Sequence, residues 1–143
     1  IISSMNLIKI LTAESQVNRK IYELILNFFK LLKSKNWIKE YIFWELEVFK
    51  TIGYDLEISK IANKEVINDK IQYVVKSSIE KKIIPSFLIN KEETIEDQNT
   101  LLNGLKLVGD YLEKTILKPN NINYPITRSQ FLNSLKWLLD DSV

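Results

Sequence analysis

The stretch from Trp37 to Ser59, WIKEYIFWELEVFKTIGYDLEIS, most constrains how this chain folds. Its apolar residues recur at spacings of three and four, which predicts an amphipathic helix with one wide apolar face. Lys50 and Gly53 are typical of a helix end, and we expect residues 54–58 to be extended. Five of the chain's fifteen aromatic residues fall in the helical part, so this helix should be central to the core. The apolar face consists of Ile38, Tyr41, Ile42, Val48, Phe49 and Ile52.

Glu45 falls on that same apolar face. We expect it to be a buried carboxylate that is satisfied by backbone donors or by a Lys or Arg side chain. The alternative is a catalytic acid with a raised pKa. The chain contains no His and no Cys, so it can form neither a Ser-His-Asp nor a Cys-His site, nor a thiolate metal site. We therefore predict that the protein is not an enzyme and holds no cofactor.

The first part of the chain predicts two further helices. Ser4 is expected to cap the first, and a polar loop should follow at residues 13–18. The second is expected to run from its cap at Asn18 to about Leu32. The predicted buried residues are Leu7, Ile8 and Leu11 in the first helix, and Ile21, Leu24, Ile25, Phe28, Phe29 and Leu32 in the second.

The last third of the chain predicts two more helices. One should begin at Thr94, in a capping box with the acidic residue three positions on, and run to about Leu117. Gly104 and Gly109 lower its helix propensity, so we expect them where a neighbouring helix packs closely. Thr127 is expected to cap the last helix. The predicted inward residues are Leu101, Leu105, Val108, Leu112, Ile116, Phe131, Leu132, Leu135, Leu138 and Leu139, with Trp137 off the stripe.

Residues 55–90 have a different pattern. Alternation at 57–61 and at 70–75, around an Asn68-Asp69 turn, predicts a small β-hairpin. Pro85 argues against a helix through the apolar connector at 83–89. We therefore predict a mostly α protein, with one helical-bundle domain of about five helices over residues 1–143 and a finger-like insertion at about 55–90.

The net charge of +2 conceals alternating blocks. Residues 1–36 carry six Lys or Arg against two Asp or Glu, residues 58–91 carry seven against three, and the other two blocks are acidic. This pattern favours a domain that meets an acidic partner through one face, rather than one that coats DNA. The alternative is that the lysines are simply solvated charges. The candidate partner or nucleic-acid surface consists of Lys30, Lys33, Lys35, Lys60, Lys64, Lys70, Lys76, Lys81 and Lys82.

An ordered set of short motifs resembles the C-terminal helical domain of the bacterial DNA repair protein RecO, over about residues 5–138. The matching residues are Tyr41, Trp44-Glu45-Leu46, Gly53-Tyr54-Asp55-Leu56, Ile58-Ser59, Tyr73-Val74 and Gly109-Asp110-Tyr111-Leu112-Glu113. The resemblance implies a non-catalytic recombination mediator that works with RecR and helps load RecA onto DNA coated by single-strand binding protein. It also implies a cytoplasmic, nucleoid-associated protein. The alternative is a generic helical scaffold or adaptor with no DNA role.

Within the family, the helical domain can dock the acidic, hydrophobic C-terminal tail of single-strand binding protein. The family's DNA-binding OB-fold is not visible here, because the first 36 residues predict helix rather than five short strands. Many relatives bind zinc through four cysteines in the finger, two of them at positions that correspond to Ile61 and Lys64. Without Cys or His no such site can form, and Ile61 is expected to be an apolar plug instead. No apolar run approaches the roughly 20 residues that span a bilayer, so no membrane partner is expected.

Overall fold

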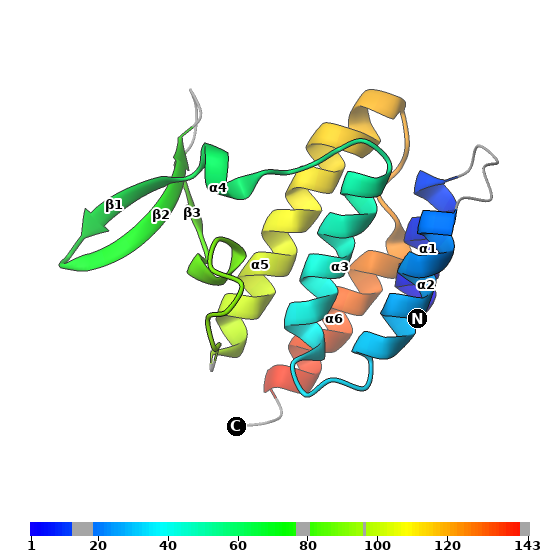
Figure 1. The fold of residues 1–143 in the computed structure, drawn as a ribbon, viewed down its shortest axis with the longest axis horizontal. Helices are drawn as coiled ribbons and strands as arrows, with labels where there is room; N and C mark the ends of the chain where they lie inside the picture. Colours follow the sequence, from blue (N-terminus) through cyan, green and yellow to red (C-terminus); the bar gives the residue numbers. More distant parts are fainter. Residues whose placement is uncertain (13–18, 77–80, 96, 141–143) are drawn as a thin grey trace. The chain divides into compact units, whose positions relative to one another are not determined.

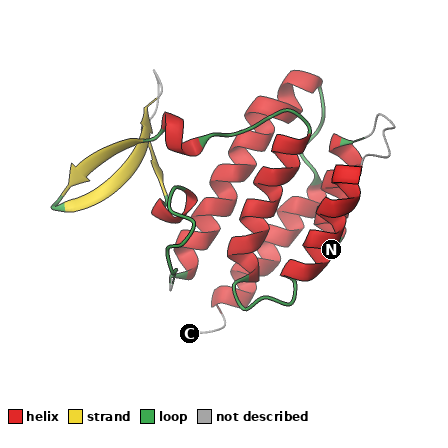
Figure 2. Cartoon of the chain, viewed as in Figure 1, coloured by secondary structure: helices red, strands yellow, loops and turns green. Residues whose placement is uncertain are grey.

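The computed structural model describes residues 1–12, 19–76, 81–95 and 97–140, and these are mostly helical, as predicted (Figure 1, Figure 2). The predicted polar loop at 13–18 and the predicted cap at Asn18 lie outside these residues. The chain divides into two compact units: residues 1–56 with 108–143, here called the helical unit, and residues 57–107, called the finger unit. The division falls within one helix, between Leu107 and Val108.

The helical unit is built around α3 (Trp37–Thr51), on which α2 (Arg19–Leu31) packs, while α1 (Ile2–Leu11) packs on α6 (Ile126–Asp140). The end of α5 (Gln98–Tyr111) also belongs to this unit, and it continues without a break into wider π-helical and then tighter 3₁₀ turns. These last turns are η2, Leu112–Leu117, and η3, Lys118–Asn120.

The central position predicted for α3 is confirmed. Most of its large apolar side chains are buried, and Trp44 donates a hydrogen bond of 2.8 Å from Nε1 to the Leu24 carbonyl on α2. Gly53 adopts φ +99° and ends the helix, because its N–H reaches the Lys50 carbonyl at 3.0 Å while the next N–H reaches Phe49 at 2.8 Å. This pair of bonds is a Schellman motif. The buried hydrophobic side chains of α3 are Tyr41, Ile42, Trp44, Val48 and Phe49.

Three predicted helix caps are wrong. The cap of α1 is Ile1, and Ser4 lies inside the first turn, where its hydroxyl donates to the Ile1 carbonyl at 2.7 Å. Thr94 precedes the start of α5, which is capped instead by Asp97, whose Oδ1 accepts the N–H two residues later at 3.0 Å. Thr127 lies within α6, and its hydroxyl accepts a hydrogen bond of 2.9 Å from Asn6 of α1. In each case another residue either caps the helix or forms a hydrogen bond with the hydroxyl that was expected to cap it.

The buried stripes are narrower than predicted. Phe29, Leu32 and Leu138 were expected inside, yet they are 47%, 38% and 67% exposed. On α2 the buried residues are Leu24, Phe28 and Leu31, which together match the one face that α3 covers. Phe29 and Leu32 each follow a buried residue by one position, so they lie at the edge of this face and are only partly covered. Outside the stripes, Trp137 is exposed, as its position on the helix predicted.

The finger unit contains a three-stranded antiparallel sheet in the order β1 (Asn63–Ile67), β2 (Lys70–Lys76) and β3 (Lys81–Ile84). Asn68 and Asp69, at φ 51° and 60°, form the predicted turn between β1 and β2. Both residues have the left-handed conformation that a type I′ hairpin turn requires. The 3₁₀ helix η1 (Ser86–Leu88) and the start of α5 complete the unit.

Two features of the finger were predicted wrongly. Residues 57–61 do not form a strand, because they contain the short helix α4 (Ile58–Ile61), in which Lys60 forms an ion pair with Glu57 one turn earlier. The first strand is displaced along the chain to β1, and the connector at 83–89 supplies the end of a third strand before Pro85. Ile61 is 48% exposed, so it is not an apolar plug.

Candidate functional site

The nine candidate lysines fall into two groups. Lys30, Lys33 and Lys35 belong to the helical unit, at the end of α2 and in the turn after it, and all three are exposed. The other six belong to the finger unit. Each unit therefore carries its own group of candidate lysines.

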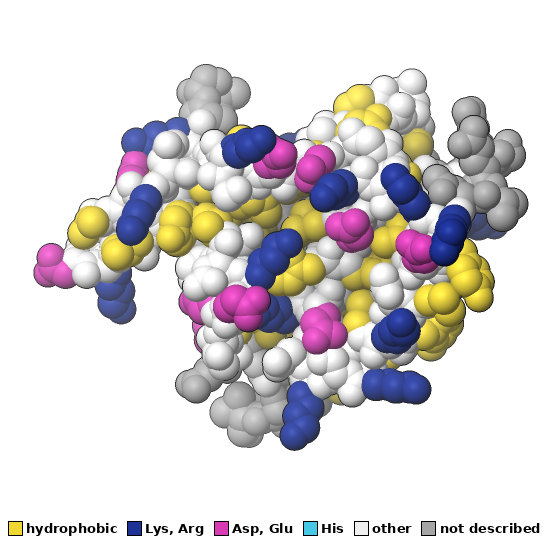
Figure 3. Space-filling view, viewed as in Figure 1, with side chains coloured by type: hydrophobic (Ala, Val, Ile, Leu, Met, Phe, Trp, Pro, Cys, Tyr) yellow, Lys and Arg dark blue, Asp and Glu magenta, His cyan; other side chains and the backbone are white. Residues whose placement is uncertain are grey.

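The exposed side of α2 carries an apolar stripe. Tyr22, Leu26 and Phe29 are 62%, 42% and 47% exposed, and their spacing of four and three residues places them on one side of the helix. Lys30 and Lys33 stand beside the C-terminal end of this stripe. We call these five residues the α2 surface. Figure 3 shows hydrophobic side chains gathered over α1 and α2 with Lys or Arg side chains next to them.

The α2 surface was only partly visible in the sequence. Phe29 was expected to be buried, and the other two apolar residues were not singled out. The signal that could have found them is the composition of α2, which has apolar residues on more than one side. A helix that packs against α3 through a single face must leave the remainder in solvent. Contiguous exposed apolar residues of this kind often mark a site for a protein partner.

In the finger unit, several lysines are paired with carboxylates. Glu65 on β1 accepts ion pairs from Lys76 of β2 and Lys81 of β3, each at 2.6 Å. The hydrogen bond from Lys76, and then that from Lys81, lowers the pKa of the Glu65 carboxyl. Lys64 and Lys70, by contrast, are exposed, and no salt bridge within the described part of the chain involves them. The positive charge available to an anionic partner is therefore concentrated on β1 and at the start of β2.

The most buried polar cluster joins α3 to α6. Arg128 donates to both carboxylate oxygens of Glu45, from Nε at 3.0 Å and from Nη2 at 3.1 Å, and the two side chains are 1% and 0% exposed. Its remaining Nη1 donates to the Tyr124 hydroxyl. Although burial opposes the charged form, the Glu45 carboxylate raises the pKa of Arg128 further above its ordinary range. The prediction of a buried carboxylate satisfied by an arginine is confirmed.

Gly109 of α5 makes room for this cluster. A Cβ at this position would lie 2.5 Å from Nη1 of Arg128 and 3.1 Å from the hydroxyl of Tyr124. The expected close approach at this glycine is therefore confirmed. The neighbour is the side chain of Arg128, which is held by hydrogen bonds, and not the backbone of a helix. Glu45 and Arg128 are closed to solvent, whereas Tyr124 is only partly buried. The ion pair therefore joins α3 to α6 inside the helical unit and does not line a surface.

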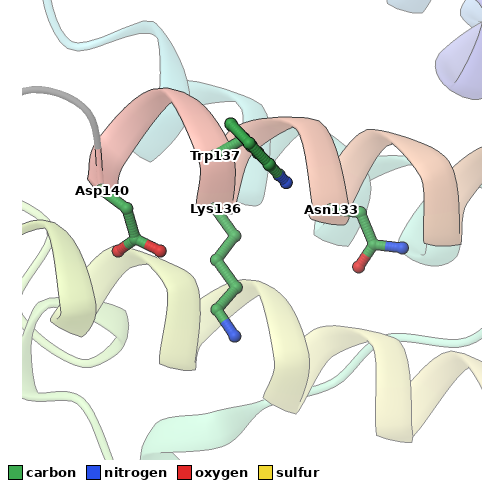
Figure 4. Close-up of a pocket in the computed structure, with 4 residues that line it drawn as sticks. All are labelled: Asn133, Lys136, Trp137 and Asp140. Carbon is green, nitrogen blue, oxygen red and sulfur yellow. The ribbon is translucent and has the colours of Figure 1, made fainter.

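Two hollows are lined by described residues of the helical unit. The larger, of about 570 Å³, is a surface depression whose described lining comes from α6 alone (Figure 4). The smaller, of about 30 Å³, lies among apolar side chains that include Phe28 and Leu32. The buried hydroxyls of Ser3 and Tyr41 also line it, and burial raises the pKa of Tyr41 well above its ordinary value. It has space for about one water molecule. The larger hollow is lined by Asn133, Lys136, Trp137 and Asp140, all of them exposed.

Among the described residues, no group of three or more Asp or Glu side chains is placed to hold a metal ion, and the sequence has no His or Cys. No helix in this part of the chain combines the length and the apolar character that crossing a bilayer requires. Comparisons with protein-family models, with curated proteins and with solved structures found no match.

Proposed function

We propose that this protein is a non-catalytic module of a RecO-type recombination mediator, and that its helical unit docks the C-terminal tail of single-strand binding protein. The observation that carries the proposal is the α2 surface, where three exposed apolar side chains lie beside two lysines. An acidic, hydrophobic tail needs these two features together: apolar contacts for its hydrophobic residues and cations for its carboxylates.

The arrangement of the motif residues also supports this proposal. Trp44 and Glu45 hold α3 to α2 and α6, Gly53 ends α3, and Gly109 leaves space for the arginine that pairs with Glu45. Most of the residues that resemble RecO therefore lie in the helical unit, while Ile58-Ser59 and Tyr73-Val74 lie in the finger unit. A chain that preserves this framework for another purpose would not need a basic, apolar face on α2.

In this proposal the module recruits the mediator to DNA coated by single-strand binding protein, where RecR and RecA then act. It adds auxiliary DNA contacts at most, because direct phosphate binding rests on many Lys and Arg contacts, and acidic blocks interrupt those of this chain. Most DNA contact would fall to an OB-fold of the same mediator. The protein would work in the cytoplasm, close to the nucleoid.

The test is a fluorescence-anisotropy titration with a labelled peptide from the C-terminal tail of the host's single-strand binding protein, at two salt concentrations. We expect saturable binding that is weaker at the higher salt, because charged contacts at a surface are screened. The double variant K30E/K33E should weaken binding by about tenfold or more, equivalent to about 1.4 kcal/mol. The variant L26Q/F29Q should have a similar effect without changing the salt dependence.

The matched control is K50E/K136E, which reverses two exposed lysines elsewhere in the helical unit. It changes the net charge by the same amount as K30E/K33E, so it should bind as the unaltered protein does if position matters. Circular dichroism confirms that each variant is folded. Equal losses in both charge variants, or no binding at all to the folded protein, would contradict the proposal and favour a scaffold without a DNA role.

A further inference from the structure

The strand β1 is an exposed edge of the finger sheet. Within the described residues it pairs with β2 alone, and its neighbours in the sheet follow the order β1-β2-β3. Val66 on this strand is 70% exposed, and Ile71, directly opposite on β2, is 56% exposed. An edge strand with apolar side chains in solvent is a template for another strand, unless the protein blocks that pairing.

The hairpin register shows which backbone groups of β1 face outward. Two residues form the turn, so Ile67 and Lys70 on either side of it are a hydrogen-bonded pair. Hydrogen-bonded and non-hydrogen-bonded pairs alternate along an antiparallel ladder. The N–H and C=O groups of Lys64 and Val66 therefore point away from β2. Neither residue is a proline or lies in a bulge, and the register from Asn63 to Ile67 is unbroken.

One face of the sheet has an unusual composition. Residues paired across the strands point to the same side, so the register assigns each side chain to a face. The face that includes Lys64 and Val66 carries no acidic residue in any of its three strands. It combines an apolar row with lysines, and an added strand would extend this surface. Its residues are Lys64, Val66, Ile71, Tyr73, Val75, Lys82 and Ile84.

We propose that the β1 edge binds an extended segment of a partner protein as an additional strand of the sheet. At every second position of this segment, on one face of the strand, acidic and apolar residues alternate. The exposed N–H and C=O groups of Lys64 and Val66 supply the backbone hydrogen bonds. On the acid-free face, an acidic residue of the segment lies next to Lys64 and an apolar residue next to Val66. This site is independent of the tail-docking function proposed above, because it lies in the other unit and uses a different mode of recognition.

A nucleic acid is the main competing occupant, because the finger also presents lysines. Two observations favour a peptide. Phosphate contact would not use the outward backbone edge, and the exposed pair Val66 and Ile71 offers no hydrogen bond to a base or a phosphate. On the opposite face the carboxylate of Glu65 holds both Lys76 and Lys81, which leaves these two lysines less able to bind a phosphate backbone.

The test uses the full chain and a capped eight-residue peptide in which aspartate and valine alternate at every second position, separated by threonine. Amide hydrogen exchange, read by nuclear magnetic resonance, reports on the edge directly. The N–H groups of Lys64 and Val66 should exchange fast in the free protein and about tenfold more slowly with saturating peptide. The N–H group of Glu65, which already bonds to β2, should change little.

The matched probe has the same sequence with N-methyl groups on the amides of one edge, so that it keeps its charges but cannot form the ladder. It should bind at least about tenfold more weakly. In the protein, Val66→Pro removes an outward N–H while sparing the β1–β2 bonds, and Val66→Thr keeps that N–H as the control. Intact exchange protection at Glu65 shows that the proline variant retains the hairpin.

Three results would overturn the proposal: no slowing at Lys64 and Val66 at saturating peptide, equal binding of the methylated probe, or full binding by the folded Val66→Pro variant. The remaining experiment measures binding of a single-stranded oligonucleotide. If it binds this face without protecting the edge amides, and the peptide does not bind, the finger is a nucleic-acid surface. K30E/K33E should leave all these readouts unchanged, so failure of tail docking and failure of this site can be told apart.

Discussion

The two units of this chain place their charges in opposite ways. The helical unit buries its central ion pair completely, with Arg128 1% and Glu45 0% exposed. The finger unit keeps its ion pairs at the surface, where the side chains of Lys76 and Lys81 are 59% and 47% exposed. The buried pair is costly to break, because each charge has lost its contacts with water. When a surface pair breaks, water replaces the partner of each charge.

The apolar residues show the same contrast between the two units. In the helical unit they fill a core around α3, and the exposed remainder lies on the outer sides of helices such as α2. In the finger unit the sheet is too small to cover its own faces, so Val66 and Ile83 remain largely in solvent. We expect substitutions inside the helical unit to affect its stability, and substitutions on the finger to affect recognition.

The largest effect should follow from Arg128→Leu, which leaves the Glu45 carboxylate buried without its partner. We expect the free energy of unfolding of the helical unit to fall by about 3–5 kcal/mol. Chemical denaturation followed by tryptophan fluorescence measures this change, because all three tryptophans lie in the helical unit.

The control is the double variant E45L/R128L, which removes both charges and keeps apolar volume at the site. It should recover much of the loss, because no unpaired charge remains. If the single and double variants were equally unstable, the shape of the arginine would matter more than its charge. The contrast between the two units would then be one of packing rather than electrostatics.

The next effect should come from Gly109→Ala. The new Cβ would overlap Nη1 of Arg128, which cannot move aside while it holds Glu45 and Tyr124. We expect a loss of about 1–3 kcal/mol, the usual cost of overpacking. In the R128L background the same substitution should cost much less stability, since Nη1 of Arg128 is then absent. An equal cost in both backgrounds would show that backbone effects, not the cluster, require this glycine.

The sequence was sufficient to predict the elements whose pattern is local. The apolar spacing of α3, its end at Gly53 and the turn at Asn68 and Asp69 each depend on neighbouring residues, and each was predicted correctly. The burial of Glu45 was also predictable from its place on an apolar face. Its partner was not, because Arg128 is 83 residues away and nothing in its own neighbourhood indicates burial.

The mistakes have both local and tertiary causes. Ser4 and Thr127 have good intrinsic capping chemistry, but the Ser4 hydroxyl bonds locally to the Ile1 carbonyl, and the Thr127 hydroxyl accepts a tertiary hydrogen bond from Asn6. Residues 57–61 alternate like a strand, yet four of them form a helical turn that the sequence pattern cannot distinguish at this length. The α2 surface depends on which face the neighbouring helix covers, and periodicity alone does not determine that choice.

A smaller effect should follow from Asp69→Gly in the hairpin turn. Asp69 has φ 60°, a left-handed conformation that is strained for most residues but not for glycine. Relief of that strain should outweigh the added freedom of the unfolded chain and stabilise the hairpin by about 0.5 kcal/mol. Slower hydrogen exchange at Glu65 would confirm it. Asn63→Gly, at an extended position of β1, is the control and should have the opposite effect.

The smallest effect concerns Glu65, whose pKa is lowered by Lys76 and Lys81. A carboxyl with a lowered pKa in the folded state stabilises the fold above its unfolded pKa, about 4.3 for glutamate. That contribution is lost as the pH falls through the lowered value. A nuclear magnetic resonance titration should show Glu65 titrating below the ordinary range, and moving up towards it in K76A/K81A.

The matched control is K64A/K70A, which removes two finger lysines that do not pair with Glu65 and should leave its titration almost unchanged. If Glu65 titrated normally in the unaltered protein, its two ion pairs would not persist in water. Lys76 and Lys81 would then be available to an anionic partner. Together with Lys70 they would make the opposite face of the sheet more basic, and the preference for a peptide on the β1 edge over a nucleic acid would lose one of its two supports.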